Sequence, residues 1–202
     1  MLIEYAYRMT HIDNIKDILN VGIVRSSSPK LNRSFVPIGD TTAIETRKYK
    51  MLSDGSNIGD YIPFYLGPRT PMLYVIQHGY NNVMRRKAEE IVYCVICIRD
   101  IIEASVPCIF TDGHALNKIT KIYPGDLLPD INKYVNYEDV YARVWNETPD
   151  AKRLKEAELL IKTDLEPHFI RYFIVYSESA KQRLLSIGVK EDMVRIAQHF
   201  YF

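Results

Sequence analysis

The sequence has little that would direct it into a membrane or out of the cell. Its longest apolar run, Ile91 to Ile98, is far shorter than the roughly 20 residues that a transmembrane helix needs. The first residues, Met1 to Arg8, do not place a basic region before an apolar segment and a small-residue cleavage site. We therefore expect a cytoplasmic protein that has no membrane partner.

Cysteine is also scarce, and three residues cannot complete a disulfide framework. Cys94 and Cys97 have the Cys-x-x-Cys spacing of a redox or zinc motif, but they lie in a β-branched run that is typical of a buried strand. A redox motif of this kind normally opens a helix, and a zinc ribbon needs a second pair of ligands. We interpret Cys94, Cys97 and Cys108 as core thiols in a reducing compartment, and we predict no metal site.

Neither sign of charge is in excess. Lys and Arg number 26 against 25 Asp and Glu, so the net charge of +1 does not by itself indicate a nucleic-acid-binding protein. Basic clusters at 47–50, 85–87 and 152–155 permit such binding without requiring it. A chain of 202 residues, of which 47% are hydrophobic and 25% charged, has the composition and length of a folded protein with one domain, residues 1–202.

The hydrophobic pattern predicts an irregular mixture of strands and helices. We expect strands at 4–9, 61–66, 72–77, 91–98, 107–110, 170–176 and 194–197. We expect helices from the N-cap Asp13 to the stop signal Gly22, at 42–50, at 101–104 and at 179–186. Residues 137–161 have a further helical signal, which Pro149 interrupts and which restarts at 150–160. Much of 26–60 should be loop. Neither a Gly-x-Gly-x-x-Gly motif nor a P-loop occurs, so a dinucleotide would not be held in the Rossmann manner.

Three polar segments stand out from this pattern, at 7–14, 112–114 and 152–161. His11 in the first segment either serves a ligand or simply caps the first helix. His114 in the second either has a chemical task or is an ordinary loop residue. Glu158 in the third borders an apolar stretch, where a carboxylate is either a solvated helix residue or a poised catalytic group. Taken singly, each residue leaves both alternatives open.

Together, these segments resemble the motifs of the DarT family of DNA ADP-ribosyltransferase toxins. The stretch from Tyr7 to Gly22 is similar to the family's opening nicotinamide-side motif, although Arg8 stands where the family often has His. The segment 61–74 (YIPFYLGPRTPMLY) is similar to the most distinctive motif. Residues 110–115 match the loop that presents a substrate-side histidine, and 144–161 resembles the region that carries the catalytic glutamate.

The resemblance implies an α/β fold of the ADP-ribosyltransferase type, with two packed central β-sheets, surrounding helices and an NAD cleft between the sheets. Glu158 would hydrogen-bond the ribose and stabilise the positive charge that builds as the bond to nicotinamide breaks. His114 would orient or deprotonate the incoming base. Arg47 would contact the nucleotide or its phosphates and assist the base, although Lys48 aligns at the same place. The residues that the resemblance assigns to NAD, the co-substrate, are Arg8, Thr10, His11, Asn14, Gly22, Arg47, Tyr65 and Tyr74.

The function implied is transfer of ADP-ribose from NAD to a base, thymine or guanine, of single-stranded DNA, by a toxin that pairs with a macrodomain antitoxin. A single strand suits this chemistry because the edge of the base must be free to approach the sugar carbon. Tyr49, between Lys48 and Lys50, would suit stacking on exposed bases. Two alternatives stay open: an ADP-ribosyltransferase that acts on RNA or protein, and a non-catalytic nucleic-acid or protein-binding module on the same scaffold.

Overall fold

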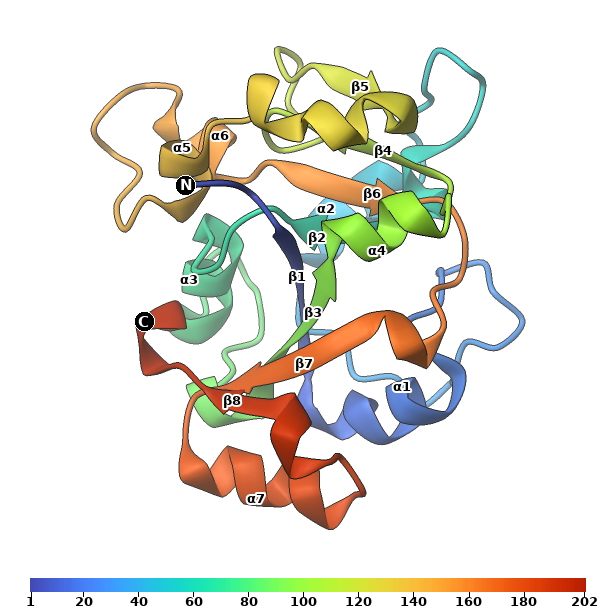
Figure 1. The fold of residues 1–202 in the computed structure, drawn as a ribbon. Helices are drawn as coiled ribbons and strands as arrows, with labels where there is room; N and C mark the ends of the chain where they lie inside the picture. Colours follow the sequence, from blue (N-terminus) through green and yellow to red (C-terminus); the bar gives the residue numbers. More distant parts are fainter.

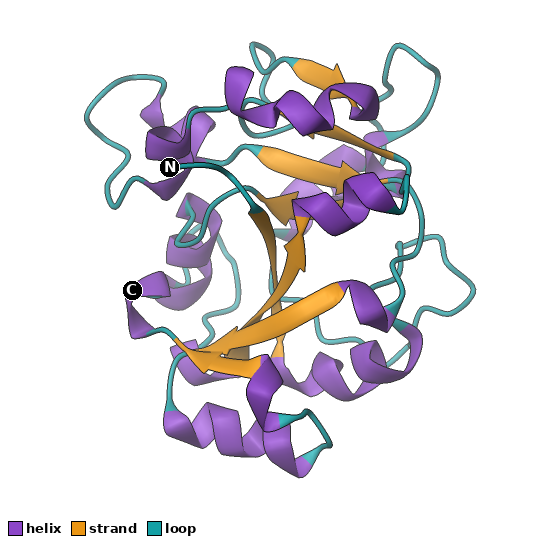
Figure 2. Cartoon of the chain, viewed as in Figure 1, coloured by secondary structure: helices purple, strands orange, loops and turns teal.

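In the computed structural model, which describes residues 1–202, eight strands form one continuous sheet (Figures 1 and 2). The strands are β1 (Tyr5–His11), β2 (Ile62–Tyr65), β3 (Ile91–Cys97), β4 (Cys108–Thr111), β5 (Ile122–Pro124), β6 (Glu158–Ile161), β7 (Ile170–Val175) and β8 (Val194–Ile196). Their order across the sheet is β5-β4-β6-β2-β1-β3-β7-β8. Only β7 and β8 run parallel to each other; the other neighbours are antiparallel.

The helices are short and lie around this sheet (Figure 2). The α-helices are α1 (Ile15–Val21), α2 (Thr41–Arg47), α3 (Pro71–His78), α4 (Ile98–Glu103), α5 (Tyr137–Tyr141), α6 (Ala151–Lys155) and α7 (Glu178–Ser186). Segments of 3-10 helix occur at Ile12–Asn14, Ile58–Asp60, Ala88–Glu90, Gly125–Lys133, Pro167–Phe169, Glu191–Met193 and Gln198–Phe200. No helix has the length and apolar character that crossing a bilayer requires.

The two central sheets that the resemblance implied are two halves of one sheet, joined by a short seam. β1 pairs with β3 along its whole length from Tyr5 to His11, but it pairs with β2 only at Tyr7 and Tyr65. Next to this pair, the side chain of Arg8 bridges the strands, because its Nη1 donates to the carbonyl of Pro63 at 3.0 Å. The fold belongs to the mixed α/β class, as expected, but one continuous sheet takes the place of the two sheets that the resemblance implied.

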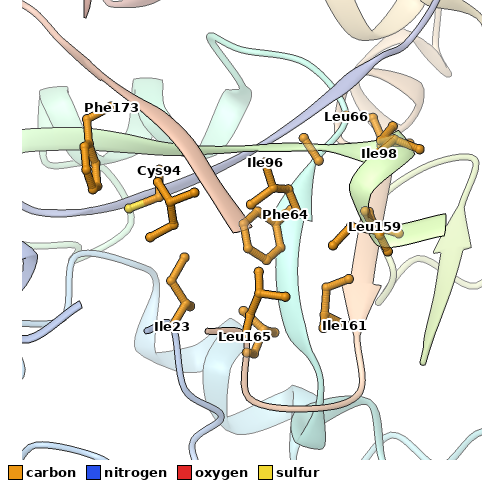
Figure 3. Packing of buried hydrophobic residues seen from close by; sticks show 14 of the residues in the cluster. Ile23, Phe64, Leu66, Cys94, Ile96, Ile98, Leu159, Ile161, Leu165 and Phe173 are labelled. Carbon is orange, nitrogen blue, oxygen red and sulfur yellow. The ribbon is translucent and has the colours of Figure 1, made fainter. Parts of the chain in front are cut away.

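The larger hydrophobic core lies on one face of the sheet, where strand residues pack against α1, α4 and α7. Figure 3 shows Cys94 packed in this core with Ile23, Ile96 and Phe173 around it. All three cysteines are free, and Cys94 is fully buried, so its environment is that of a core thiol. A second cluster on the other face joins Tyr7 and Tyr93 to Leu73 and Ile76 of α3.

Most of the predicted elements are present, but four predictions are wrong. The helix predicted from Tyr137 to the interruption at Pro149 is present only as α5, which ends at Tyr141. Residues 72–77, predicted as a strand, form α3, because Thr70 caps its first turn and Pro71 occupies the first helical position. The helix predicted at 150–160 ends with α6, and the chain continues as strand β6 from Glu158. Asp13 is not the cap of α1; it lies inside the 3-10 turn Ile12–Asn14 that precedes that helix.

Candidate active site

Glu158 is the first residue of β6, in the middle of the sheet. It pairs with Tyr65 on β2, and its carboxylate is only 1% exposed, which rules out the solvated alternative. The N–H of Glu158 donates to the hydroxyl of Thr111 at 3.0 Å, and this hydroxyl in turn donates to the carbonyl of Gly113 at 2.7 Å. Thr111 therefore fixes the beginning of β6 to the loop that carries His114.

Arg47, the last residue of α2, supplies the partner of this carboxylate. Its Nη2 lies 2.7 Å from Oε1 and 2.6 Å from Oε2 of Glu158. Burial alone would lower the pKa of the Arg47 guanidinium, but the charge and hydrogen bonds of Glu158 outweigh it and leave the pKa raised. Lys48 points elsewhere and pairs with Glu45 at 2.6 Å. Of the two cations that could occupy this position, Arg47 is the one that reaches Glu158.

The loop after β4 completes the surroundings of Glu158. The N–H of Ala115 donates to Oε1 at 2.9 Å, and Nε2 of His114 lies 4.0 Å from the same oxygen. Burial lowers the pKa of His114; Glu158 opposes this shift, whereas the nearby cations Arg47 and Lys50 add to it. His114 is therefore neutral at physiological pH and can accept a proton.

Arg153 holds this loop in place, a role that the sequence did not reveal. Its Nη1 donates to the carboxylate of Asp112 at 2.7 Å, and its carbonyl accepts the N–H of His114 at 3.1 Å. A Cβ on Gly113 would lie 2.5 Å from Nη1 and 2.9 Å from the backbone oxygen of Arg153, so only glycine fits at this position. The sequence shows Arg153 as one of several basic residues, and nothing in that pattern indicates its partner 41 positions away.

A cavity of about 180 Å³ lies in front of this cluster, beside the seam between β1 and β2. Glu158 does not line it, but its partners Arg47 and His114 do. Most of the wall is apolar, and the full lining is Arg8, Met9, Thr10, Phe35, Pro37, Ile38, Gly39, Asp40, Ala43, Ile44, Arg47, Pro63, Tyr65, Met72, Ile76 and His114. Ligand sites of drug size occupy roughly 300–1,000 Å³, so a dinucleotide would extend beyond this cavity.

Arg47, which lines the cavity, has one buried polar atom without a partner. Nη1 of Arg47 is buried and has no hydrogen-bond partner in the protein, although the same guanidinium binds Glu158 through Nη2. A buried donor without a partner is costly, so such groups normally meet an acceptor. The donor, the apolar wall and the ring of Tyr65 suit a ligand that combines acceptor oxygens with flat rings, as NAD does. No group of three or more His, Cys, Asp or Glu side chains is placed to hold a metal ion.

Four of the residues that the resemblance assigns to NAD lie in this wall: Arg8, Thr10, Arg47 and Tyr65. Burial raises the pKa of the Tyr65 hydroxyl, and the carboxylates Glu156 and Glu158 raise it further, so this group stays protonated. These residues come from strands β1 and β2 and from the end of α2, which the fold brings to one cavity.

His11 and Asn14 lie next to the cavity wall and do not line it. Nδ1 of His11 accepts the N–H of Asp13 at 3.2 Å, so His11 caps the 3-10 turn Ile12–Asn14 that precedes α1. Asn14 is buried and holds the segment that covers the cavity: its Oδ1 accepts the N–H of Val36 at 2.8 Å, and its Nδ2 donates to the carbonyl of Val36 at 2.9 Å. Asn14 thereby positions the neighbouring Pro37 and Ile38, which do line the cavity.

Gly22 and Tyr74 lie away from the cavity. Gly22 ends α1 with a φ of +83°, and a Cβ there would meet the carbonyl of Leu165 at 2.1 Å. Tyr74 projects from α3 into an aromatic cluster with His78, Trp145 and Phe202. The residues of α3 that reach the cavity are Met72 and Ile76.

Comparison with known proteins decides the family. Residues 7–202 match the family model described as DarT, ssDNA thymidine ADP-ribosyltransferase. The chain belongs to the DarT family. A DNA ADP-ribosyl transferase from Escherichia coli O127:H6 is 31% identical over 183 residues, which cover 88% of this chain and 83% of that protein. Membership makes this chain an NAD-dependent DNA ADP-ribosyltransferase.

Solved structures of DarT from Thermus sp. 2.9 share the fold. The structure in complex with ADP-ribosylated ssDNA superposes with a TM-score of 0.84 at 26% identity and covers 98% of this chain and 96% of its own. The complex with NAD+ has a TM-score of 0.79 and covers 100% of this chain. In Thermosipho africanus, a DNA ADP-ribosyl transferase–DNA ADP-ribosyl glycohydrolase fusion protein is 26% identical over 88% of this chain and 44% of its own length.

Proposed function

We propose that this DarT-family chain transfers ADP-ribose from NAD to thymidine in single-stranded DNA, and that Glu158, Arg47 and His114 carry the reaction. One observation supports this assignment most directly: the buried carboxylate of Glu158 contacts a guanidinium and an imidazole that both line the wall of one cavity, and one nitrogen of that guanidinium has no partner. The Thermus relatives bind NAD+ and ADP-ribosylated ssDNA in the same fold.

The first half of the reaction breaks the bond between nicotinamide and the ribose carbon. Nicotinamide leaves with the electron pair, and positive charge builds on the ribose. Glu158 hydrogen-bonds a ribose hydroxyl and stabilises this charge from a fixed position, since Arg47 and the N–H of Ala115 already orient its carboxylate. Tyr65 supplies a flat surface at the cavity wall for the nicotinamide ring.

The second half forms the bond between the ribose carbon and a ring nitrogen of the base. Thymine in a nucleoside carries one ring N–H, and this proton must leave as the new bond forms. His114 takes it, because the lowered pKa keeps its imidazole neutral and able to accept a proton. A base in a duplex would have the same N–H engaged in pairing, which accounts for a single-stranded acceptor.

A DNA-modifying enzyme of this kind needs control in the cell that makes it. The Thermosipho africanus relative carries a DNA ADP-ribosyl glycohydrolase in the same chain. We infer that the present chain acts in the cytoplasm as the toxin of a pair, and that its antitoxin is a glycohydrolase of the macrodomain type that removes the modification.

Mass spectrometry of oligonucleotides tests the acceptor. After incubation with NAD, we expect a single-stranded oligonucleotide with one thymidine to gain the mass of one ADP-ribose. A matched oligonucleotide with cytidine in place of thymidine, the annealed duplex and an RNA of the same sequence should gain none. Modification of the thymidine-free strand, or of RNA or protein in place of DNA, from a preparation that cleaves NAD would overturn the thymidine assignment.

The pH dependence of transfer tests His114. Because its pKa lies below the usual value, the imidazole is neutral above that pKa and is protonated, and therefore inactive as a base, below it. The rate should be level around neutral pH and fall as the pH drops through the lowered pKa. His114→Gln should lose about 10²-fold in rate and abolish this acidic limb.

His168, which is exposed and pairs with Glu166, offers the control: His168→Gln should retain both the rate and the acidic limb. An unchanged acidic limb in His114→Gln would assign that limb to another group and remove His114 as the base.

A further inference from the structure

A second cavity, which shares no lining residue with the cavity at the active site, is lined by cations that have no carboxylate partner. It measures about 410 Å³ and is formed where the end of β2, α5, α6 and the C-terminal segment meet. Figure 1 shows α3, the α5–α6 segment and the C-terminus on one side of the molecule. The residues that matter for its chemistry are Arg69, Tyr141, Arg143, Lys155, His199 and Phe200.

Lys155 is the deepest of these cations, with 1% of its surface exposed. Its Nζ donates to the carbonyls of Pro68 at 2.8 Å and Val140 at 2.5 Å, and no aspartate or glutamate pairs with it. A buried ammonium without an anion is unusual, because lysine is almost never fully buried unless it is paired. Burial lowers the pKa of Lys155 to about 7 and the nearby Arg69 adds to this shift, so an anion bound beside Nζ would favour the charged form of the side chain.

Arg69 and Arg143 add two more cations to this cavity. The Arg69 guanidinium donates through Nε to the carbonyl of Tyr201 at 3.0 Å and through Nη1 to the carbonyl of Arg143 at 3.0 Å, and it makes no hydrogen bond through Nη2. The side chain of Arg143 is exposed and takes part in no ion pair. No aspartate or glutamate lines the cavity, so Arg69, Arg143 and Lys155 concentrate positive charge in one hollow.

Aromatic rings lie in the same cavity as these cations. The rings of Tyr141 and Phe200 line it beside the cations, and its volume falls in the range of roughly 300–1,000 Å³ that is typical of small-ligand sites. Cations with adjacent aromatic rings are the combination that binds nucleotides, because the cations hold phosphate and the rings pack against the base or sugar.

We propose that this cavity is a second site that binds the phosphate of a nucleotide, with Lys155, Arg69 and Arg143 on the phosphate and with Tyr141 and Phe200 against the attached nucleoside. The nucleotide is either free or part of a DNA strand outside the modified base. In the second case the site extends the acceptor-binding surface and rests on the proposed function.

Fluorescence of Trp145, the chain's one tryptophan, gives a direct measurement. Its ring lies 5.6 Å from that of Phe202, over which the Arg69 guanidinium sits at 4.2 Å. We would titrate the full chain, without NAD, with deoxycytidine 5′-phosphate, deoxycytidine and inorganic phosphate. We use a cytosine nucleotide because the active site is expected to bind adenine, as part of NAD, and thymine, as the acceptor base. We expect the two phosphates to bind, and deoxycytidine to bind about tenfold more weakly than its 5′-phosphate.

Substitution of Arg143 supplies the decisive comparison, because this side chain is exposed and can be replaced without disturbing the fold. Arg143→Glu should weaken binding of deoxycytidine 5′-phosphate by about tenfold or more, and Arg143→Gln by less, since reversal of the charge also repels the phosphate. Lys16→Glu, an equal charge change at an exposed residue of α1, should leave binding within about twofold. Equal affinities of Arg143→Glu and wild type, or of nucleoside and nucleotide, would overturn the site.

Transfer kinetics then separate the two sources of phosphate. If the site holds the DNA strand, Arg143→Glu should raise the KM for a long oligonucleotide and leave NAD cleavage unchanged. If it takes a free nucleotide, that KM should stay the same. The binding titration needs neither NAD nor transfer, so its failure is distinct from a failure of the proposed reaction.

Discussion

Glu158→Gln should reduce ADP-ribose transfer by about 10³-fold while the protein stays folded, because loss of one preorganised electrostatic contact to a transition state costs on this order. Gln has the same shape and keeps an amide oxygen that can accept from Arg47 and from the N–H of Ala115. It has no negative charge to stabilise the ribose as nicotinamide departs. Single-turnover rates with NAD and a one-thymidine oligonucleotide, together with thermal unfolding of both proteins, measure the two effects.

Glu166→Gln is the matched control, since it removes the same charge from an exposed residue beyond the end of β6. Its transfer rate should equal that of the wild type. If Glu158→Gln retained wild-type activity, the chain would use another group to stabilise the ribose, and the proposed mechanism would be wrong. If it lost activity and stability together, an isosteric replacement would have exposed a structural role of the Glu158–Arg47 pair.

The sequence predicted those elements of the fold that have a clear boundary signal or a long apolar run. Residues 91–98 have the pattern of a buried strand, and β3 lies inside the sheet between β1 and β7. The apolar run at 72–77 was misread, because a short segment of this kind fits a strand and a buried helix equally well. Thr70 and Pro71 held the information that decides for a helix, since they supply an N-cap and a favoured first residue.

The continuity of the sheet could not be predicted from local patterns. It depends on the pairing of β1 with β2 at Tyr7 and Tyr65, which lie far apart in the chain. Nor could the pattern around Glu158 distinguish a helix from a strand, because α6 and β6 follow each other within a few residues.

The resemblance to the DarT motifs identified the central residues of the candidate site. Glu158, Arg47 and His114 were named as a set, and the fold brings their side chains together. The resemblance implies that the segment 26–60 folds over NAD, but the residues that cover the cavity, such as Phe35, Pro37 and Ile44, lie in a stretch without periodic pattern and could not be named. A sequence motif also contains residues that support the backbone, and His11 and Gly22 occupy such positions.

The choice between Arg47 and Lys48, which the sequence left open, leads to the other large effect that we expect. Arg47→Ala should lower transfer by about 10³-fold and weaken NAD binding by roughly tenfold to a hundredfold, because it removes a contact to Glu158 and a charged donor to the ligand. Arg47→Lys should recover part of the loss. An ammonium can reach Glu158 but cannot at the same time offer NAD a second N–H that the same rigid group holds in place. Calorimetric titration with NAD and single-turnover transfer rates separate the two contributions.

Lys48→Ala provides the control at the adjacent position, since Lys48 is half exposed and pairs with Glu45 on the surface. It should bind NAD and transfer ADP-ribose within about twofold of the wild type, as expected for a surface ion pair. A loss in Lys48→Ala equal to that in Arg47→Ala would mean that the segment 41–50 rearranges when NAD binds and presents the lysine instead. Full activity of Arg47→Lys would show that charge alone suffices, and the unpaired Nη1 of Arg47 would then have no part in holding NAD.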